Sequence, residues 1–194
     1  GEFPAWLVEA LVDPVETLYA TGQSDTITVE RDGDQVQVFV DALTAPSELV
    51  IFGTGHDVGP VAELGQKMDY RVTVAGFRGG QATDDRFPNA DRVVSTSPAD
   101  ADEALDLDGD TYAVVMTHNF IDDRIAVETL LDTDVPYIGL MGPDERFQEI
   151  LDAFEEEGRD VAGADLERIY TPIGLDLGGG TPYQIAMSIL AEVE

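Results

Sequence analysis

A glycine-rich turn between an apolar segment and a helical segment is the part of this sequence best suited to bind a ligand. The apolar residues 49–52 lead directly into Gly53, Gly55 and Gly59, spaced as Gly-x-Gly-x-x-x-Gly. Glycines at such a turn let the backbone approach an anionic group, which then binds the free N–H groups at the start of the helix. A Rossmann-type domain begins in this way, although the spacing here is one residue longer than in the commonest dinucleotide motif.

The two histidines of the sequence follow two of the expected strands. His56 comes after the first strand, and Thr117 and His118 come at the end of the strand expected at 112–117. Ligands of an open parallel sheet bind where the strand order reverses, which for the order 3-2-1-4-5 is between these two strand ends. The histidines therefore either orient a ligand or fill ordinary roles in turns. A metal held by both of them and a carboxylate such as Asp57 is less favoured, because the spacing is not that of a metal-binding motif.

The end of the second expected strand bears on which nucleotide could bind. Enzymes that use NAD carry an acidic residue there, about 20 residues after the glycine loop, to hold the ribose. This sequence has Gly76, Phe77 and Arg78 instead. Arg78 could accept the 2′-phosphate of NADP, or it could meet another phosphate or an acidic neighbour. The residues argue against NAD and leave NADP as a possible cofactor.

A second glycine-rich segment precedes the last expected helix. Three glycines at 178–180 lead to Thr181, a suitable N-cap, and to Pro182 at the first helical position. They form either a second anion-binding loop made of backbone N–H groups or a flexible connection to the helix. Gly139 and Gly142, near the end of the fifth expected strand, leave the same two alternatives open.

The composition indicates a folded and very acidic protein. The 194 residues are 43% apolar and include 40 acidic and 10 basic residues, for a net charge of −30. We interpret this charge as adaptation to a salt-rich cytoplasm, as in haloarchaea, because about 1 M salt confines repulsion to roughly 3 Å. Nucleic acid is not expected as a partner, since phosphate contacts require Lys and Arg. Only Arg78, Arg86 and Arg146 lie in or near loops where they could help to hold an anion.

Several kinds of site are excluded by residues that this sequence lacks. It contains no cysteine, which rules out disulfides, thiolate metal sites and thiol nucleophiles within it. It has neither a Ser-His-Asp pattern nor a Walker lysine. No segment approaches the roughly 20 apolar residues of a membrane span, and no secretory signal opens the sequence. We therefore expect a cytoplasmic protein that does not enter a membrane.

Alternating strand and helix patterns predict an α/β fold for residues 47–194. Strands are expected at 49–52, 71–75, 92–95, 112–117, 136–141 and 169–170, and helices at 58–68, 98–105, 121–131, 144–157 and 182–193. Repeated βα units of this length imply a Rossmann-like parallel sheet flanked by helices. Residues 1–46 form a small appendage, with one or two short helices over 4–19 broken at Pro14, and a β-hairpin of 25–31 and 35–41.

Taken in order, these segments resemble the C-terminal domain of the xanthine dehydrogenase accessory factor family (XdhC/CoxI). The resemblance spans about residues 36–193 and includes Val115-Met-Thr-His118 and Tyr137-Ile-Gly-Leu-Met-Gly142. Its most specific part is Pro172-Ile-Gly-Leu-Asp176 followed by Gly-x-x-Thr-Pro182. The sequence differs from the family's usual pattern in a shorter N-terminal region and in Gly76, where an acidic residue usually precedes the retained arginine.

The resemblance implies a non-catalytic protein that binds molybdenum cofactor, protects it while its sulfido ligand is installed, and assists its insertion into a xanthine dehydrogenase-type molybdoenzyme. A separate cysteine desulfurase would supply the sulfur, and a homodimer is a further hypothesis. The candidate cofactor-binding residues are Gly53, Gly55, His56, Gly59, Arg78, Thr117, His118, Gly139, Gly142, Asp176, Gly179 and Thr181. The alternatives are an NADP-dependent oxidoreductase anchored by Arg78 and a nucleotide-sensing Rossmann module.

Overall fold

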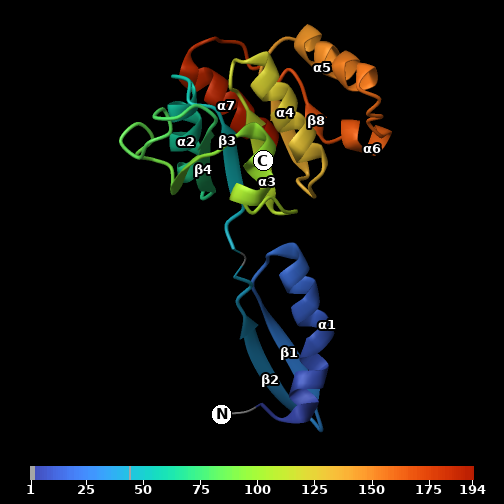
Figure 1. Ribbon diagram of the computed structural model, residues 1–194. Helices are drawn as coiled ribbons and strands as arrows, with labels where there is room; N and C mark the ends of the chain where they lie inside the picture. The colour runs from blue at the N-terminus through green and yellow to red at the C-terminus, as the bar shows by residue number, and fades with distance from the viewer. Residues whose placement is uncertain (1–2, 44) are drawn as a thin grey trace. The chain divides into compact units, whose positions relative to one another are not determined.

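The computed structural model describes residues 3–43 and 45–194 and divides into two compact units, residues 1–45 and 46–194 (Figure 1). The N-terminal unit consists of the helix α1 (Ala5–Thr21) and an antiparallel hairpin of β1 (Asp25–Arg31) and β2 (Asp34–Val40). The hairpin agrees with the sequence prediction, because its strands alternate apolar and polar residues around a tight turn.

The predicted break of the first helix at Pro14 is wrong, since α1 runs through this residue. A proline inside a helix removes one hydrogen bond and favours a kink, which does not by itself end the helix. Leu7 and Leu11, which precede the proline, are buried. Leu18 lies on the same side of α1 after the proline and is half-buried. The helix ends instead at Gly22, whose φ of 61° is the left-handed conformation typical of helix C-termini.

The second unit is built on a six-stranded parallel sheet in the order β5-β4-β3-β6-β7-β8. The strands are β3 (Glu48–Phe52), β4 (Arg71–Gly76), β5 (Arg92–Ser95), β6 (Thr111–Val115), β7 (Tyr137–Leu140) and β8 (Ile169–Tyr170). This order confirms the Rossmann-like fold and places the reversal of strand order between β3 and β6, as predicted.

Helices cover both faces of this sheet (Figure 1). They are α2 (Val58–Lys67), the 3₁₀ turn η1 (Pro98–Asp100), α3 (Ala101–Ala104), α4 (Phe120–Leu131), α5 (Asp144–Glu156), α6 (Gly163–Leu166) and α7 (Pro182–Val193). The single helix predicted at 98–105 is a 3₁₀ turn that continues into α3. The four-residue α6 was not predicted, because so short a helix has no apolar periodicity. Within residues 3–43 and 45–194, no helix has the length and apolar character needed to cross a membrane.

The central strand β3 supplies both cores with alternate side chains. Val50 and Phe52 pack against α4 and α5, whereas Leu49 and Ile51 pack against α2 and α7. Successive side chains of a strand point to opposite faces, so a strand covered on both sides is apolar throughout. This packing fixes the carboxyl end of β3, from which the candidate site begins.

Every cationic side chain of the protein is already engaged by a neighbour. Arg31, Lys67, Arg71, Arg78, Arg124, Arg146, Arg159 and Arg168 pair with carboxylates, and Arg86 and Arg92 donate hydrogen bonds to backbone carbonyls. With 40 acidic residues and only 10 basic ones, most carboxylates have no cation to pair with. The folded chain must therefore carry considerable self-repulsion in dilute salt.

We expect the melting temperature to rise by at least about 5 °C between ~0.1 and 3 M KCl, because salt screens this repulsion. Circular dichroism melts across the KCl series measure the effect. Sucrose is the control, since it favours compact states by exclusion from the protein surface without screening charge. A melting temperature that does not change with KCl, or that rises equally in sucrose, would contradict stabilisation by screening of the repulsion between carboxylates.

Candidate functional site

The candidate site lies between the carboxyl ends of β3 and β6, where the strand order reverses. Gly53 begins the loop after β3 with a φ of 142°, and its N–H donates to the Ala75 carbonyl oxygen at 2.9 Å. A Cβ at this position would lie 2.5 Å from the Met116 carbonyl oxygen. Gly53 therefore lets the loops after β3 and β6 approach each other, which is a packing role that precedes any contact with a ligand.

A buried carboxylate joins these two loops. The Asp57 Oδ2 atom lies 2.9 Å from the His118 Nε2 atom, and the two side chains are 6% and 53% exposed. His118 has a φ of 60°, a left-handed conformation that few non-glycine residues adopt. A Cβ on Gly55 would lie 2.5 Å from the Asp57 Oδ1 atom and 3.3 Å from the His118 ring. Gly55 thus leaves room first for the Asp57 carboxylate and then for the imidazole, which is half exposed.

The second oxygen of this carboxylate lacks a partner. Asp57 Oδ1 is buried and accepts no hydrogen bond from any of the described residues. An unmatched buried acceptor costs about 1–3 kcal/mol and is uncommon unless water or a ligand satisfies it. Asp57 immediately precedes α2, where the positive end of the helix dipole stabilises negative charge. The unmatched oxygen is enclosed by the loop at Gly55, so a ligand that donates to it must first open this loop.

A second buried carboxylate, Asp123 in the first turn of α4, organises the loop after β6. Its Oδ1 atom accepts a hydrogen bond from the Thr117 N–H at 3.2 Å and another from the Thr117 hydroxyl, and its Oδ2 atom lies 2.7 Å from Arg146 Nη2. Burial raises the pKa of Asp123, an effect opposed by Thr117 and Arg146. A Cβ on Gly142 would lie 2.8 Å from Arg146 Cδ, so this glycine gives the arginine its path to Asp123.

Arg78 spans the crevice from the loop after β4 to Asp122 in α4, so its guanidinium is not a free cation. Its Nη2 atom lies 2.8 Å from Asp122 Oδ2, and its side chain is 65% exposed. A cavity of about 30 Å³ lies beneath this pair and is lined by Gly53, Thr54, Phe77, Arg78, Thr117 and Asp122. That volume suits a water molecule, so a larger ligand must lie over the crevice or displace the ion pair.

The family model of the XdhC Rossmann domain matches residues 49–193, which include the six-stranded sheet except Glu48 and both loops of the site. The chain belongs to the XdhC family. Among related proteins, a probable xanthine dehydrogenase subunit from Bacillus subtilis (strain 168) is 26% identical over 193 residues, covering 100% of this chain and 54% of the relative. The uncharacterised protein YqeB of Escherichia coli (strain K12) is 28% identical over 162 residues, covering 83% of this chain and 29% of the relative.

A solved structure supports the same assignment. A crystal structure of a xanthine dehydrogenase from Bacillus halodurans superposes on this chain with a TM-score of 0.68 and 26% identity, covering 85% of this chain and 46% of the other. The chain therefore spans between 29% and 54% of the length of the proteins that it matches.

The other predicted glycines and His56 of this XdhC-family chain are not gathered around His118. His56 is exposed in the loop before α2, and Gly59 lines a separate cavity of about 200 Å³ together with Arg86 and Tyr183. Gly139 lies inside β7, where a Cβ would collide with Ile173 Cδ1. Gly139 thus permits close packing, whereas Gly59 leaves open space beside the first turn of α2.

The glycine-rich segment before α7 forms a helix cap in the structure. Thr181 accepts a hydrogen bond from the Gln184 N–H while the Gln184 side chain accepts from the Thr181 backbone, which is a complete capping box. A Cβ on Gly179 would lie 2.7 Å from the Gln184 Oε1 atom, so Gly179 makes room for this cap. Asp176 is exposed in the same segment.

Sequence reasoning missed the two carboxylates that hold the site together. The sequence suggested Asp57 only as a metal ligand and gave Asp123 no role in the site. The available signal was an acidic first turn directly after a strand that ends in Thr117 and His118, but acidic residues at a helix start usually serve the helix dipole alone. Among the described residues, no group of three or more histidines, aspartates or glutamates is arranged to hold a metal ion.

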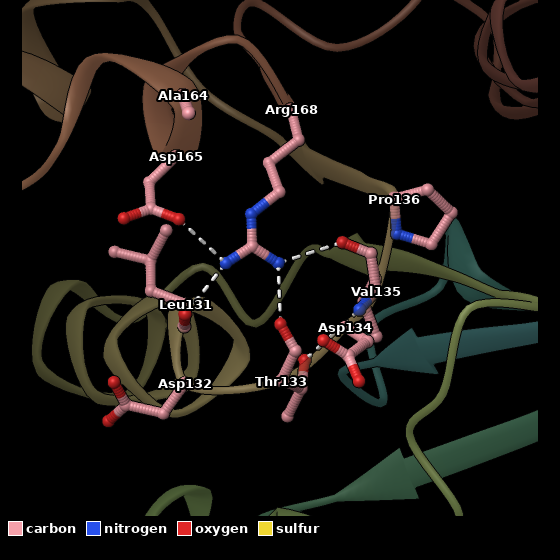
Figure 2. Close-up of a pocket in the computed structure, with 9 residues that line it drawn as sticks. All are labelled: Leu131, Asp132, Thr133, Asp134, Val135, Pro136, Ala164, Asp165 and Arg168. Atoms are coloured by element: carbon pink, nitrogen blue, oxygen red, sulfur yellow. Dashed lines mark hydrogen bonds and ion pairs between the residues drawn. The ribbon is translucent and has the colours of Figure 1, made fainter.

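A further cavity lies at the opposite, amino-terminal edge of the sheet. It measures about 550 Å³ and is lined by Leu131–Pro136, Ala164, Asp165 and Arg168. Figure 2 shows the Arg168 guanidinium donating to the backbone carbonyls of Leu131, Thr133 and Val135 and contacting Asp165. Because its N–H groups are used in this way, Arg168 serves the fold and offers little to an anionic ligand.

Proposed function

We propose that this chain binds a pterin-molybdenum cofactor over the loops that follow β3 and β6, and holds it for insertion into a xanthine dehydrogenase-type molybdoenzyme. In this role the chain catalyses no reaction itself. Membership of the XdhC family and the names of two similar proteins support the proposal. The observation that carries it is the buried Asp57 carboxylate, which is paired with His118 on one oxygen and lacks a partner on the other.

The Asp57–His118 pair suits the nitrogen-rich edge of a pterin. That edge presents an amino group and a ring N–H side by side, and a carboxylate accepts such neighbouring donors well. Asp57 Oδ1 is an acceptor to which none of the described residues donates, but it is buried, so the pterin edge would reach it only on opening of the loop after β3; the half-exposed His118 ring would meet the pterin first. The residues therefore fit the heterocyclic part of the cofactor. The bound group would supply redox-active molybdenum to the recipient enzyme, while these side chains only bind and orient it.

The phosphate of the cofactor would meet few cations. All ten cationic side chains are engaged within the protein, so phosphate contacts would depend on backbone N–H groups at the start of α2. Gly59 leaves space there, and Arg78 could help by leaving Asp122. Weak phosphate binding suits a carrier, because a protein that passes its ligand to an enzyme must release it.

Sulfur for the cofactor would come from another protein. This sequence contains no cysteine to carry a persulfide. We therefore retain a cysteine desulfurase as the proposed sulfur donor, and the molybdoenzyme as the proposed recipient.

Ligand-induced thermal stabilisation in about 2–3 M KCl tests the site. Cofactor released from a molybdoenzyme should raise the melting temperature, since a ligand at 100 times its Kd adds about 2.7 kcal/mol to the stability of the folded state that binds it. His118→Ala should weaken cofactor binding about 5- to 10-fold through loss of one hydrogen-bonding contact. His56→Ala removes the exposed histidine of the neighbouring loop and is the matched control, with affinity expected to stay within about 2-fold of wild type.

Three outcomes would count against the proposal. Absence of any cofactor-induced shift would reject cofactor binding by this chain. Equal losses in both histidine variants would reject the assignment to the Asp57–His118 pair. Stabilisation by NADP alone, abolished by Arg78→Ala, would replace the proposal with an NADP-dependent oxidoreductase.

A further inference from the structure

The carboxylates at the crevice between β3 and β6 differ in how their charge is balanced. Asp122 and Asp123 each pair with an arginine, at 2.8 and 2.7 Å. Among the described residues, neither an arginine nor a lysine pairs with Asp57, whose partner is His118 at 2.9 Å. A histidine gains its positive charge only by protonation, between about pH 5 and 8. The charge of Asp57 is therefore balanced at the low end of this range and unbalanced at the high end.

Salt does not remove this dependence on pH. The Asp57 side chain is 6% exposed, and dissolved ions screen a buried charge much less than an exposed one. The lysine and arginine side chains are all engaged with other groups. Protonation of His118 is therefore the available source of positive charge beside this carboxylate.

The hydrogen bond to Asp57 decides which nitrogen of His118 can meet a ligand. A carboxylate oxygen accepts, so the Nε2 atom beside it carries a hydrogen whether the ring is neutral or protonated. Nδ1 has no hydrogen-bond partner within residues 46–194, and the side chain is 53% exposed. Nδ1 is thus an acceptor in the neutral ring and a donor in the protonated ring, while the contact with Asp57 stays the same.

We propose that the chain takes up one proton from solvent on Nδ1 of His118 when the cofactor binds, a step that rests on the cofactor-binding role proposed above. On the edge of a pterin a carbonyl oxygen stands next to the ring N–H. A protonated Nδ1 donates to such an oxygen, whereas the lone pair of a neutral Nδ1 repels it. The same proton balances the charge of Asp57, which otherwise repels the anionic phosphate of the cofactor.

Other groups near His118 are already paired or are exposed. The charged and titratable groups on the elements around it are Asp57 and His56 from the loop before α2, Arg78 from the loop after β4, Asp122 and Asp123 from α4, and Arg146 from α5. Burial raises the pKa of Asp123, but Thr117 and Arg146 oppose this effect. His56 and Asp123 are therefore the groups whose titration the experiment must separate from that of His118.

The pH dependence of cofactor affinity tests the proposal in about 2 M KCl. Cofactor released from a molybdoenzyme is titrated without oxygen at about pH 5.5 and 7.5, and its affinity is obtained from the rise in melting temperature. Binding that takes up a proton weakens as protons become scarcer, because the two binding equilibria are linked. The quantity compared between variants is the ratio of the affinities at the two pH values.

His118→Gln is the decisive variant, because the glutamine amide keeps a donor for Asp57 and cannot take up a proton. The phosphate of the cofactor also titrates in this range, and it contributes to the wild type and the variant alike, as does Asp123. We expect the ratio to be at least about 5-fold larger in the wild type than in His118→Gln. His56→Ala removes the other histidine and should keep the wild-type ratio.

Asp57→Asn repeats the test if His118→Gln fails to fold or to bind. It removes the charge that favours the protonated ring, so the ratio should be at least about 3-fold smaller than in the wild type. Equal ratios in the wild type, His118→Gln and Asp57→Asn would overturn the uptake of a proton by His118 and leave the proposed function standing. A ratio that changes only in His56→Ala would overturn it as well. Absence of cofactor binding at both pH values would reject the proposed function itself, and the proton uptake with it.

Discussion

Gly53→Ala is expected to destabilise the protein by about 3–5 kcal/mol, the combined cost of an unfavourable backbone conformation and of overpacking. The φ of 142° at this position is one that alanine rarely adopts. The added Cβ would lie 2.5 Å from the Met116 carbonyl oxygen, which belongs to the backbone and cannot rotate away. Urea unfolding in about 2 M KCl measures the change, with salt present to screen the net charge.

Gly59→Ala is the control that separates two kinds of glycine within the same loop motif. No heavy atom lies within 4 Å of a Cβ at Gly59, which sits in the first turn of α2. Alanine there should stabilise the protein by about 0.5–1 kcal/mol, because glycine in a helix loses more backbone entropy on folding. A loss below about 1 kcal/mol for Gly53→Ala would show that the loops after β3 and β6 can separate, contrary to the packing described here.

These two glycines illustrate how far the sequence can predict the site. Their spacing after an apolar strand correctly indicates a Rossmann-type turn, because that turn is a local feature of strand, loop and helix. The backbone for which Gly53 makes room is that of Met116, which directly follows β6 and lies 63 residues further along the chain. Such a contact depends on how the strands are ordered and cannot be read from the motif.

The histidines and carboxylates show the same contrast: the local sequence predicts where they lie along the chain, and contacts with distant residues decide what they pair with. His118 could be expected at the edge of the sheet because it directly follows a buried strand. Its pairing with Asp57, 61 residues away, depends on the left-handed backbone at His118 and on the space left by Gly55. Asp123 is a further case, since an acidic first turn predicts a helix start, and only the packing of Arg146 from α5 turns that carboxylate into a buried ion pair.

The fold was more predictable than the site because each βα unit has its own apolar periodicity. The predicted strands 92–95 and 169–170 coincide with β5 and β8, and the last helix coincides with α7. The predictions that failed concern single short segments and not the order of the strands. Pro14 does not end α1, and α6 has too few residues to show a pattern.

Arg168→Met is expected to cost about 2–4 kcal/mol through carbonyl groups that lose their donors. The guanidinium donates to Leu131 at 2.6 Å and to Thr133 and Val135 at 2.8 Å each, at the end of α4 and in the loop that enters β7 (Figure 2). It also carries positive charge at the C-terminus of a helix, where such charge is stabilising. The adjoining cavity lets water reach some of the freed carbonyls, which keeps the loss below the sum of the individual bonds.

Arg71→Met is the matched control, because Arg71 is 63% exposed and pairs with Glu48 at 3.3 Å. Loss of such an exposed pair is worth about 0–1 kcal/mol. Arg168→Lys should recover less than half of the loss caused by Arg168→Met, since an ammonium group cannot span carbonyls that a planar guanidinium reaches together. Equal losses in Arg71→Met and Arg168→Met would contradict the role given to Arg168.

Arg168→Met also distinguishes a loss of stability from a loss of ligand binding, because Arg168 and the candidate site lie at opposite edges of the sheet. Arg168 lies at the amino-terminal edge, whereas His118 lies at the carboxyl edge where the strand order reverses. Arg168→Met, measured below its melting temperature, should keep the wild-type affinity for the cofactor despite its lower stability. His118→Ala should lose affinity for the proposed cofactor and also about 1–3 kcal/mol of stability, since it leaves both oxygens of the buried Asp57 carboxylate without a partner. Loss of cofactor binding in Arg168→Met with the fold intact would instead move the ligand to the large cavity of Figure 2.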